Sequence, residues 1–212
     1  MRNKENKVSL VERQGIWYEI NSQVPFTGVG ELYFENGELQ KRANWKAGEL
    51  DGLAESYFED GQLEERSNWK AGLHDGLTES YFENGQLRAR GNWKAGEADG
   101  LAESYYGNGQ LRLRENFIAG KRDGLRERYY ENGQLQVRAN WKAGERDGLA
   151  ERYFENGELQ KRANWKAGLQ DGLVERYYEN GQLRASENYI AGEPINGECW
   201  NEQGLTMDCS DL

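Results

Sequence analysis

The sequence predicts an all-β fold: an elongated, twisted, single-layer antiparallel β-meander in which one β-hairpin follows another. Three observations predict it. A 24-residue unit, such as GLAERYFENGELQKRANWKAGLQD at 148–171, recurs seven times without a gap, and a fixed period of this size indicates a repeat array. Each copy carries an Asn-Gly or Asp-Gly pair between short aromatic-rich runs, which is typical of hairpins. Only 36% of the chain is hydrophobic, so a thin sheet is expected.

The repeat divides the chain into three parts. Residues 1–27 are expected to form an N-terminal cap with a short hairpin around Gln14-Gly15, and residues 196–212 a C-terminal capping hairpin and an acidic tail. Repeat arrays need such terminal caps. The seven repeats fill residues 28–195, and their first residues are Gly28, Gly52, Gly76, Gly100, Gly124, Gly148 and Gly172.

The Asn-Gly pair predicts a tight turn in every copy. Asn156 and Gly157 both accept positive φ, as a type I′ hairpin turn requires. If the residues on either side of this pair face each other, the register of the whole hairpin follows. The predicted cross-strand pairs are Phe154 with Leu159, Tyr153 with Gln160, Glu151 with Arg162, Leu149 with Asn164 and Gly148 with Trp165, and across the next turn Arg162 with Glu175.

Alternation along the strands assigns the two faces of the sheet. One face holds Trp165, Ala163, Leu159, Phe154 and Ala150 and is the more apolar. The other holds Tyr153, Glu151, Arg162, Leu149 and Asn164, and we expect its Glu/Arg column to be exposed to solvent. The lack of a side chain at Gly148 is expected to leave room for the neighbouring indole.

The net charge of −10 favours a basic protein partner and argues against nucleic acid. The acidity is greatest toward the two ends of the array. In the copy that begins at Gly52, six acidic residues oppose two basic ones, and no Lys or Arg follows Asn196.

No enzymatic, cofactor or metal site is predicted. The single histidine, His74, is interpreted as a solvated turn residue beside Asp75, and the many carboxylates recur opposite Arg, as in a structural ladder. The glycines lack the helix or Lys that a phosphate loop needs. Cys199 and Cys209 are too few for a disulfide framework; the strand pattern sets Cys199 opposite Asp208, and both one disulfide and two thiols stay open.

No run of residues is apolar enough for a membrane span, and residues 1–27 lack the apolar core of a secretory signal. The expected location is therefore cytoplasmic, or periplasmic or at the cell surface if an N-terminal signal has been removed.

The run WKAGERDGLAERYFENGEL at 141–159 resembles a MORN repeat, because Trp141, Gly144 and Gly148 match its W-x-x-G-x-x-x-G spacing. The Tyr-Tyr-x-Asn-Gly-x-Leu text from Tyr129 is similar to the bacterial second variety of that repeat, found in the YwqK family of antitoxins. The resemblance covers about residues 16–205. It implies a MORN-type hairpin array that binds a partner protein, in some members an antitoxin or immunity protein against a toxin. The alternative is a structural or membrane-associated scaffold, although net charge −10 does not favour anionic membranes.

Two aromatic columns are the candidate partner-binding residues. Their simplest interpretation is that they stiffen the sheet, but a single layer cannot bury both of its faces, and exposed aromatic patches mark interaction sites. The changing residue pair before each Asp-Gly is the other feature that strand pairing leaves unexplained. The candidates are Trp45, Trp69, Trp93, Trp141 and Trp165 in one column and Tyr57, Tyr81, Tyr105, Tyr129, Tyr153 and Tyr177 in the other.

Overall fold

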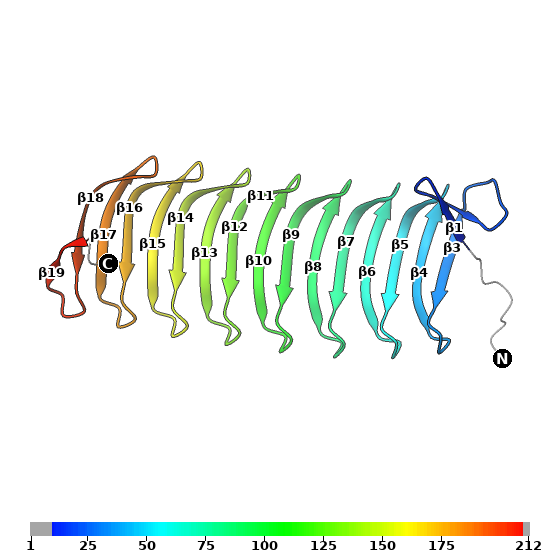
Figure 1. The fold of residues 1–212 in the computed structure, drawn as a ribbon, viewed down its shortest axis with the longest axis horizontal. Helices are drawn as coiled ribbons and strands as arrows, with labels where there is room; N and C mark the ends of the chain where they lie inside the picture. The colour runs from blue at the N-terminus through cyan, green and yellow to red at the C-terminus, as the bar shows by residue number, and fades with distance from the viewer. Residues whose placement is uncertain (1–9, 210–212) are drawn as a thin grey trace. The chain divides into compact units, whose positions relative to one another are not determined.

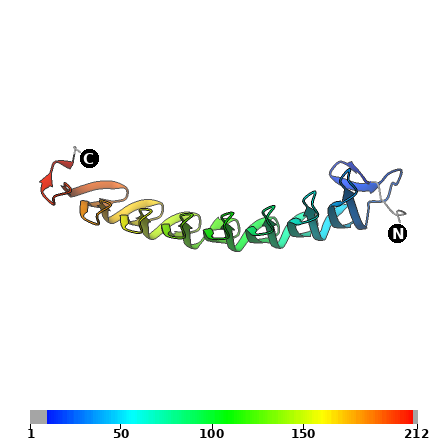
Figure 2. The same cartoon turned by 90° about the horizontal axis from the view of Figure 1, so that it is seen from below.

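The computed structural model describes residues 10–209 and confirms the predicted fold class (Figures 1 and 2). All named elements in this range are β-strands. β1 and β2 form a separate antiparallel hairpin, and in the repeats the strands pair antiparallel in chain order, with β10 pairing with both β11 and β12. The chain forms two compact units, residues 1–100 and residues 101–212. None of the described residues forms a helix with the length and hydrophobicity that a membrane crossing needs.

The N-terminal unit begins with a two-stranded hairpin, after which the repeat strands follow in order. The hairpin turns at Gln14-Gly15, as predicted. The strands are β1 (Leu10–Arg13), β2 (Ile16–Glu19), β3 (Gly28–Tyr33), β4 (Leu39–Lys46), β5 (Glu49–Tyr57), β6 (Leu63–Lys70), β7 (Leu73–Tyr81) and β8 (Leu87–Lys94), and β9 (Glu97–Tyr105) crosses into the second unit.

The C-terminal unit continues the same pattern. Its strands are β10 (Leu111–Ile118), β11 (Lys121–Arg122), β12 (Gly124–Tyr129), β13 (Leu135–Lys142), β14 (Glu145–Tyr153), β15 (Leu159–Lys166), β16 (Leu169–Tyr177), β17 (Leu183–Ile190), β18 (Glu193–Trp200) and β19 (Thr206–Met207). Residues 210–212 of the predicted acidic tail lie outside the described residues.

The central part of the predicted register is correct. Between β14 and β15, Glu151 faces Arg162 and Gly148 faces Trp165, and across the following turn Arg162 faces Glu175. Like positions of successive repeats therefore stack into columns, in which each side chain has neighbours on both flanking strands.

The predicted type I′ turn at Asn-Gly is wrong. Only Gly157 has positive φ, at 90°; its N–H donates to the Phe154 carbonyl, and the Phe154 N–H donates to the Glu158 carbonyl. This is a three-residue loop that ends in a left-handed glycine. The Asn156 side chain selects it, because Oδ1 accepts the Glu158 N–H at 2.9 Å.

The longer loop and a bulge shift the pairs nearest the turn. Tyr153 faces Leu159, so the predicted pairs of Phe154 with Leu159 and Tyr153 with Gln160 are wrong. Residues that face each other lie on the same side of a sheet. Leu159 therefore shares the face of Tyr153, and not that of Trp165 as predicted.

The type I′ geometry occurs instead at the Ala-Gly pair of each repeat. Ala167 has a φ of 48° and Gly168 a φ of 79°, and both values are left-handed, as this turn requires. A non-glycine residue there is strained by its Cβ. The Ala167 N–H is held by a side chain from the preceding repeat, Asp147, whose Oδ2 accepts it at 3.3 Å.

Asp147 and Gly148 form a bulge opposite β13, because Ala139 faces Ala150 whereas Trp141 faces Arg146. Gly148 has a φ of 103°, and a Cβ placed there would lie 3.4 Å from the Asn140 Cβ. The predicted reason for this glycine, room for an indole, is therefore wrong. The backbone conformation of the bulge requires it.

The two faces of each unit are named here by their aromatic columns. The tryptophan face carries Trp45, Trp69 and Trp93 in the N-terminal unit and Trp141 and Trp165 in the C-terminal unit, with small residues such as Ala163 beside them. The tyrosine face carries the Glu/Arg column and the tyrosines of the second predicted column.

Replacing Ala167 by Asn tests the Ala-Gly turn. We expect Ala167→Asn to raise the free energy of unfolding by about 0.5–1 kcal/mol, because Asn accepts left-handed φ more readily than Ala. Ala167→Val should lower it, because a β-branched residue is disfavoured at positive φ. Urea unfolding followed by tryptophan fluorescence measures both. A lower stability for Ala167→Asn would contradict the assignment.

Candidate protein-binding surfaces

In several repeats the residue before the Asp-Gly pair stacks between aromatic rings on the tryptophan face. The imidazole of His74 lies 3.7 Å from the Trp69 ring and 5.3 Å from the Trp93 ring, measured between centroids. His74 faces Trp69 in strand β7, so its interpretation as a solvated turn residue is wrong. It is a partly buried component of the aromatic column.

The same position holds arginines in two repeats of the C-terminal unit and Gln170 in the third. The Arg146 guanidinium lies 5.7 Å from the Trp141 ring centroid and 4.8 Å from that of Trp165. Arg122 lies 5.8 Å from Phe117 and 5.4 Å from Trp141. Such cation–π stacking leaves the edges of the guanidinium free to donate hydrogen bonds.

A groove of about 920 Å³ follows the tryptophan face of the N-terminal unit. Small residues on its floor, including Ala43 and Ala54, leave space beside Trp45 and Trp69. The N-terminal hairpin bounds one end, where the Trp17 and Trp45 ring centroids are 5.3 Å apart. The groove thus has aromatic walls and a shallow floor, the shape that an apolar side chain of a partner can enter.

A second hollow, of about 490 Å³, lies at the Asn-Gly turns of the same unit. Phe34 and Phe58 supply its apolar surface. Its other lining residues include four carboxylates and one lysine, namely Glu59, Asp60, Glu64, Glu83 and Lys41. Glu64 and Lys41 also line the groove, so the aromatic and acidic surfaces adjoin.

The tyrosine face carries a ladder of carboxylates, of which Glu103 and Glu151 are buried and the others are partly buried. Glu151 is only 3% exposed and accepts hydrogen bonds from Arg138 at 2.5 Å, Arg162 at 3.0 Å and the Tyr153 hydroxyl at 2.9 Å. The predicted solvent exposure of the Glu/Arg column is therefore wrong for its carboxylates. Its arginines are about half exposed.

These contacts shift the pKa values of the ladder. Burial raises the pKa of Glu151, but hydrogen bonds from Arg138, Tyr153 and Arg162 outweigh it, and the net pKa is lowered. Burial and the bond to Glu151 raise the pKa of Tyr153. The tyrosine is therefore a neutral hydrogen-bond donor to an ionised carboxylate at neutral pH.

Two indole N–H groups of the C-terminal unit are buried without a hydrogen-bond partner, those of Trp141 and Trp165. In the N-terminal unit Trp69 donates to the Ser67 hydroxyl at 2.9 Å. The residue equivalent to Ser67 two positions before Trp165 is Ala163, which has no acceptor. The indole N–H of Trp165 thus lacks an acceptor because this repeat has alanine where an earlier repeat has serine.

All eleven predicted candidate residues are partly buried, and the two columns lie on opposite faces. A partner on one face therefore contacts only one of the columns. Sequence reasoning did not place Leu50, His74, Arg122 and Arg146 in the tryptophan column. Their variation at one fixed repeat position was the available signal.

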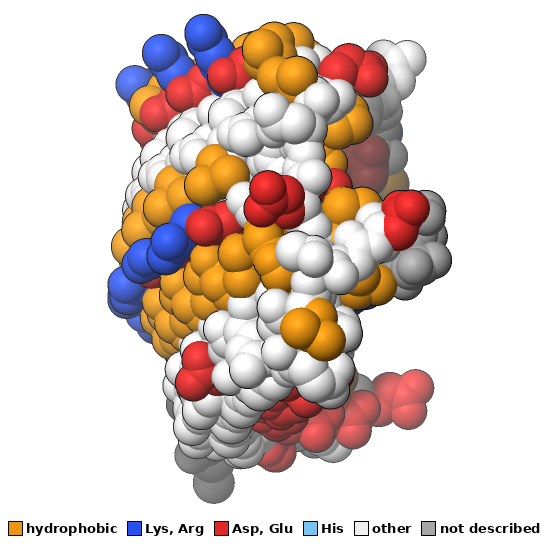
Figure 3. Space-filling model, turned by 90° about the vertical axis from the view of Figure 1, so that its left-hand side faces the viewer, with side chains coloured by type: hydrophobic (Ala, Val, Ile, Leu, Met, Phe, Trp, Pro, Cys, Tyr) orange, Lys and Arg blue, Asp and Glu red, His pale blue; other side chains and the backbone are white. Residues whose placement is uncertain are grey.

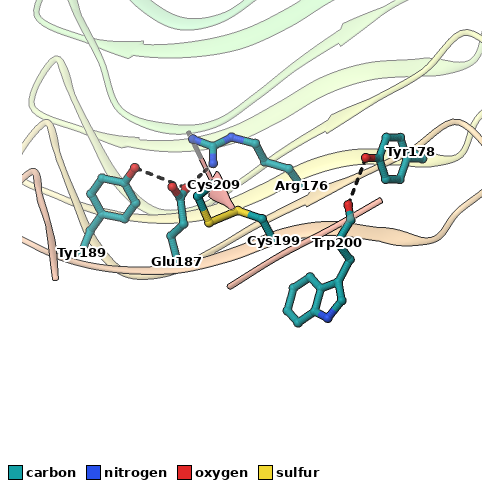
Figure 4. The surroundings of a disulfide bond; sticks show 7 residues. All are labelled: Arg176, Tyr178, Glu187, Tyr189, Cys199, Trp200 and Cys209. Atoms are coloured by element: carbon teal, nitrogen blue, oxygen red, sulfur yellow. Dashed lines mark hydrogen bonds and ion pairs between the residues drawn. A yellow bond between two sulfur atoms is a disulfide. The ribbon is translucent and has the colours of Figure 1, made fainter. Parts of the chain in front are cut away.

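Cys199 and Cys209 form a disulfide with a Cα–Cα distance of 5.3 Å (Figure 4). Cys199 faces Met207, not Asp208 as predicted. The bond fixes the chain end beside β18, where the Tyr178 hydroxyl also donates to the Trp200 carbonyl at 3.0 Å. Among residues 10–209 no cluster of three or more His, Cys, Asp or Glu side chains is placed to hold a metal ion.

Comparison with known families finds a match to the family described as MORN repeat variant. It covers seven segments that together exceed half of the chain: 26–47, 50–71, 75–95, 98–119, 122–143, 146–167 and 170–191. No curated protein matches the chain.

Ala163→Ser tests the unsatisfied indole. The new hydroxyl is expected to accept the Trp165 N–H, as Ser67 does for Trp69, and to raise the free energy of unfolding by about 1 kcal/mol. Ser67→Ala, the matched reverse change, should lower it by about 1–2 kcal/mol. Urea unfolding measures both. If both substitutions change the free energy of unfolding in the same direction, the hydrogen bond to the indole is not the cause.

Glu151→Gln tests the ladder. At pH 7 we expect a loss on the order of 2 kcal/mol, because charge-assisted hydrogen bonds are lost. The folded-state pKa of Glu151 is lowered from its ordinary value of 4.5. Its stabilisation is therefore present above pH 4.5 and is lost as the pH falls through the folded-state pKa.

The variant should consequently show a weaker loss of stability on acidification than the native chain, measured as urea midpoints from pH 7 to pH 3. Glu155→Gln, an exposed turn substitution, is the control and should reproduce the native pH profile. The ladder interpretation fails if the profile of Glu151→Gln is as steep as that of the control.

Proposed function

We propose, from the premise that this chain belongs to the MORN repeat family, that it is a non-enzymatic antitoxin or immunity protein that occludes a basic partner toxin. MORN repeats suggest a protein-binding or scaffold role, and their all-β fold is not a known enzyme family. The observation that carries the proposal is the aromatic groove of the N-terminal unit with an acidic hollow beside it.

The groove supplies anchoring surface and the hollow supplies charge. Trp45 and Trp69 present partly buried rings on both sides of Leu50, and aromatic residues in such hollows commonly dominate binding energy. Glu59, Asp60 and Glu83 lie at the adjacent turns. Their negative charge would accelerate the encounter with a basic surface and orient it. Inhibition would be steric, because the partner's functional surface would be covered.

The Cys199–Cys209 disulfide indicates in which cellular compartment the protein would act. Disulfides persist in oxidising compartments, so the bond favours the periplasm or cell surface over the cytoplasm as the place of action. The proposal therefore concerns a toxin met outside the reducing cytoplasm.

The test is co-expression with the product of a neighbouring gene, followed by co-purification and growth rescue. We expect a complex, rescue from toxicity, and a loss of affinity of roughly 30-fold for Trp69→Ala, as for an anchor worth about 2 kcal/mol. Trp165→Ala, in the C-terminal unit, is the matched control and should retain the affinity. No complex and no rescue would remove the antitoxin proposal.

A salt titration separates the acidic hollow from the groove. The double variant Glu59→Gln/Asp60→Asn should slow association and weaken its dependence on ionic strength, while dissociation stays near the native rate. Stopped-flow measurement at two salt concentrations reads this directly. An unchanged association rate would show that the hollow does not face the partner.

A further inference from the structure

Basic residues concentrate on the tryptophan face of the C-terminal unit, although the chain as a whole is acidic. Among the paired strand residues between 101 and 209, the register places seven of them on this face and two carboxylates, Glu115 and Glu187. Figure 3 shows Lys and Arg side chains in rows with Asp, Glu and hydrophobic side chains beside them; the basic residues of the tryptophan face are placed by the strand register. The seven are Arg122, Arg126, Arg128, Arg146, Arg152, Lys161 and Arg176.

The N-terminal unit has a different chemistry at most of the same repeat positions, although Lys41 is an equivalent of Lys161. Ser56 and Ser80 are the equivalents of Arg128 and Arg152, and Leu50 and His74 are those of Arg122 and Arg146. Since the backbone pattern is the same, the fold does not require the arginines. Their concentration therefore indicates a ligand rather than a structural need.

The two carboxylates neutralise only part of this charge. Glu115 pairs with Arg122 at 2.7 Å and Arg126 at 3.2 Å, and Glu187 pairs with Arg176 (Figure 4).

In the part of the chain that the structure describes, Arg128, Arg152 and Lys161 have no carboxylate within salt-bridge distance. Burial, followed by repulsion from Arg176, lowers the pKa of Lys161. Attraction to Glu187 offsets part of this effect at Lys161, whereas Arg128 and Arg152 carry positive charge without a paired carboxylate among the described residues.

The charges are also regularly spaced. Arg128, Arg152 and Arg176 occupy one position in three successive repeats, so each is two strands from the next, or about 10 Å at ~4.8 Å per strand. A polypeptide in the extended polyproline II conformation advances about 3.1 Å per residue with three residues per turn, so every third side chain points to the same side. Such side chains, about 9 Å apart, therefore meet successive arginines, while the Trp141 and Trp165 rings and the stacked Arg146 lie alongside.

We propose that the tryptophan face of the C-terminal unit binds an extended acidic polypeptide segment with a carboxylate at about every third residue. One carboxylate would bind Arg128 and the next would bind Arg152, beside which Lys161 lies on the paired strand, and intervening apolar side chains would contact Trp141 and Trp165. Glu131, Glu155 and Glu179 in the adjoining turns restrict access by a continuous polyanion. Nucleic acid, with one charge about every 3.4 Å of each strand, fits this spacing less well.

A fluorescein-labelled twelve-residue peptide, four copies of Glu-Ala-Ser, is the probe, and fluorescence anisotropy against the full chain is the measurement. We expect saturable binding that weakens with salt, and at least tenfold weaker binding of the matched Lys-Ala-Ser peptide. The double variant Arg128→Ser/Arg152→Ser should bind the acidic peptide at least tenfold more weakly. Serine is the residue that the N-terminal unit carries at these positions, so the variant should fold, as its thermal unfolding checks.

The control is Lys142→Ser/Lys166→Ser, which removes the same charge from exposed residues next to the Ala-Gly turns and should leave binding unchanged. Equal losses in both double variants would overturn the proposal in favour of unspecific charge attraction. Absence of acidic-peptide binding, or tighter binding of a single-stranded oligonucleotide through the same arginines, would also overturn it. The probe and variants differ from those used for the basic partner, so failure of either proposal is distinguishable from failure of the other.

Discussion

The carboxylate column of the tyrosine face, buried at Glu103 and Glu151 and partly buried in the other repeats, is the interaction on which the rest of the structure depends. A single-layer sheet has no second layer to cover it, so a side chain can be buried only by its neighbours on the same face. Glu151 reaches 3% exposure in this way, between arginines from the two flanking strands and the tyrosine two residues further along. A carboxylate buried without these donors would be strongly unfavourable. The ladder therefore penalises any slip in register between strands.

Because the ladder on the tyrosine face sets the register, the residues on the tryptophan face can differ between repeats. On the tryptophan face the indoles form a regular column, and the residue between them changes from Leu50 and His74 in the N-terminal unit to Arg122 and Arg146 in the C-terminal unit. The same backbone thus supports an aromatic groove in one unit and a cationic face in the other. Recognition is separated from stability, because the residues that vary are not those that set the register.

The glycines and alanines of the turns allow side chains of one repeat to hydrogen-bond to the backbone of the next. Gly148 and Ala167 both have positive φ, and Asp147 connects the bulge of one repeat to the Ala-Gly turn of the next through a hydrogen bond to the Ala167 N–H. Asn132 makes a similar link, because its Nδ2 donates to the Glu155 carbonyl of the following repeat at 3.2 Å. Each repeat is therefore tied to its neighbour at both ends of its strands, as expected for an array in which stability depends on adjacent units.

The sequence by itself determined the all-β repeat architecture, the antiparallel order and the central register, because the 24-residue period and the opposed Glu and Arg allow only one alignment over several residues. It also separated the Trp and Tyr columns, since alternation in a strand is geometric. Only the tertiary structure decided the turn types, the bulges, the burial of the Glu column and the stacking of the residue before Asp-Gly. The physical reason is that Asn accepts both loop conformations and that burial in one layer depends on the neighbouring repeats, which no single strand specifies.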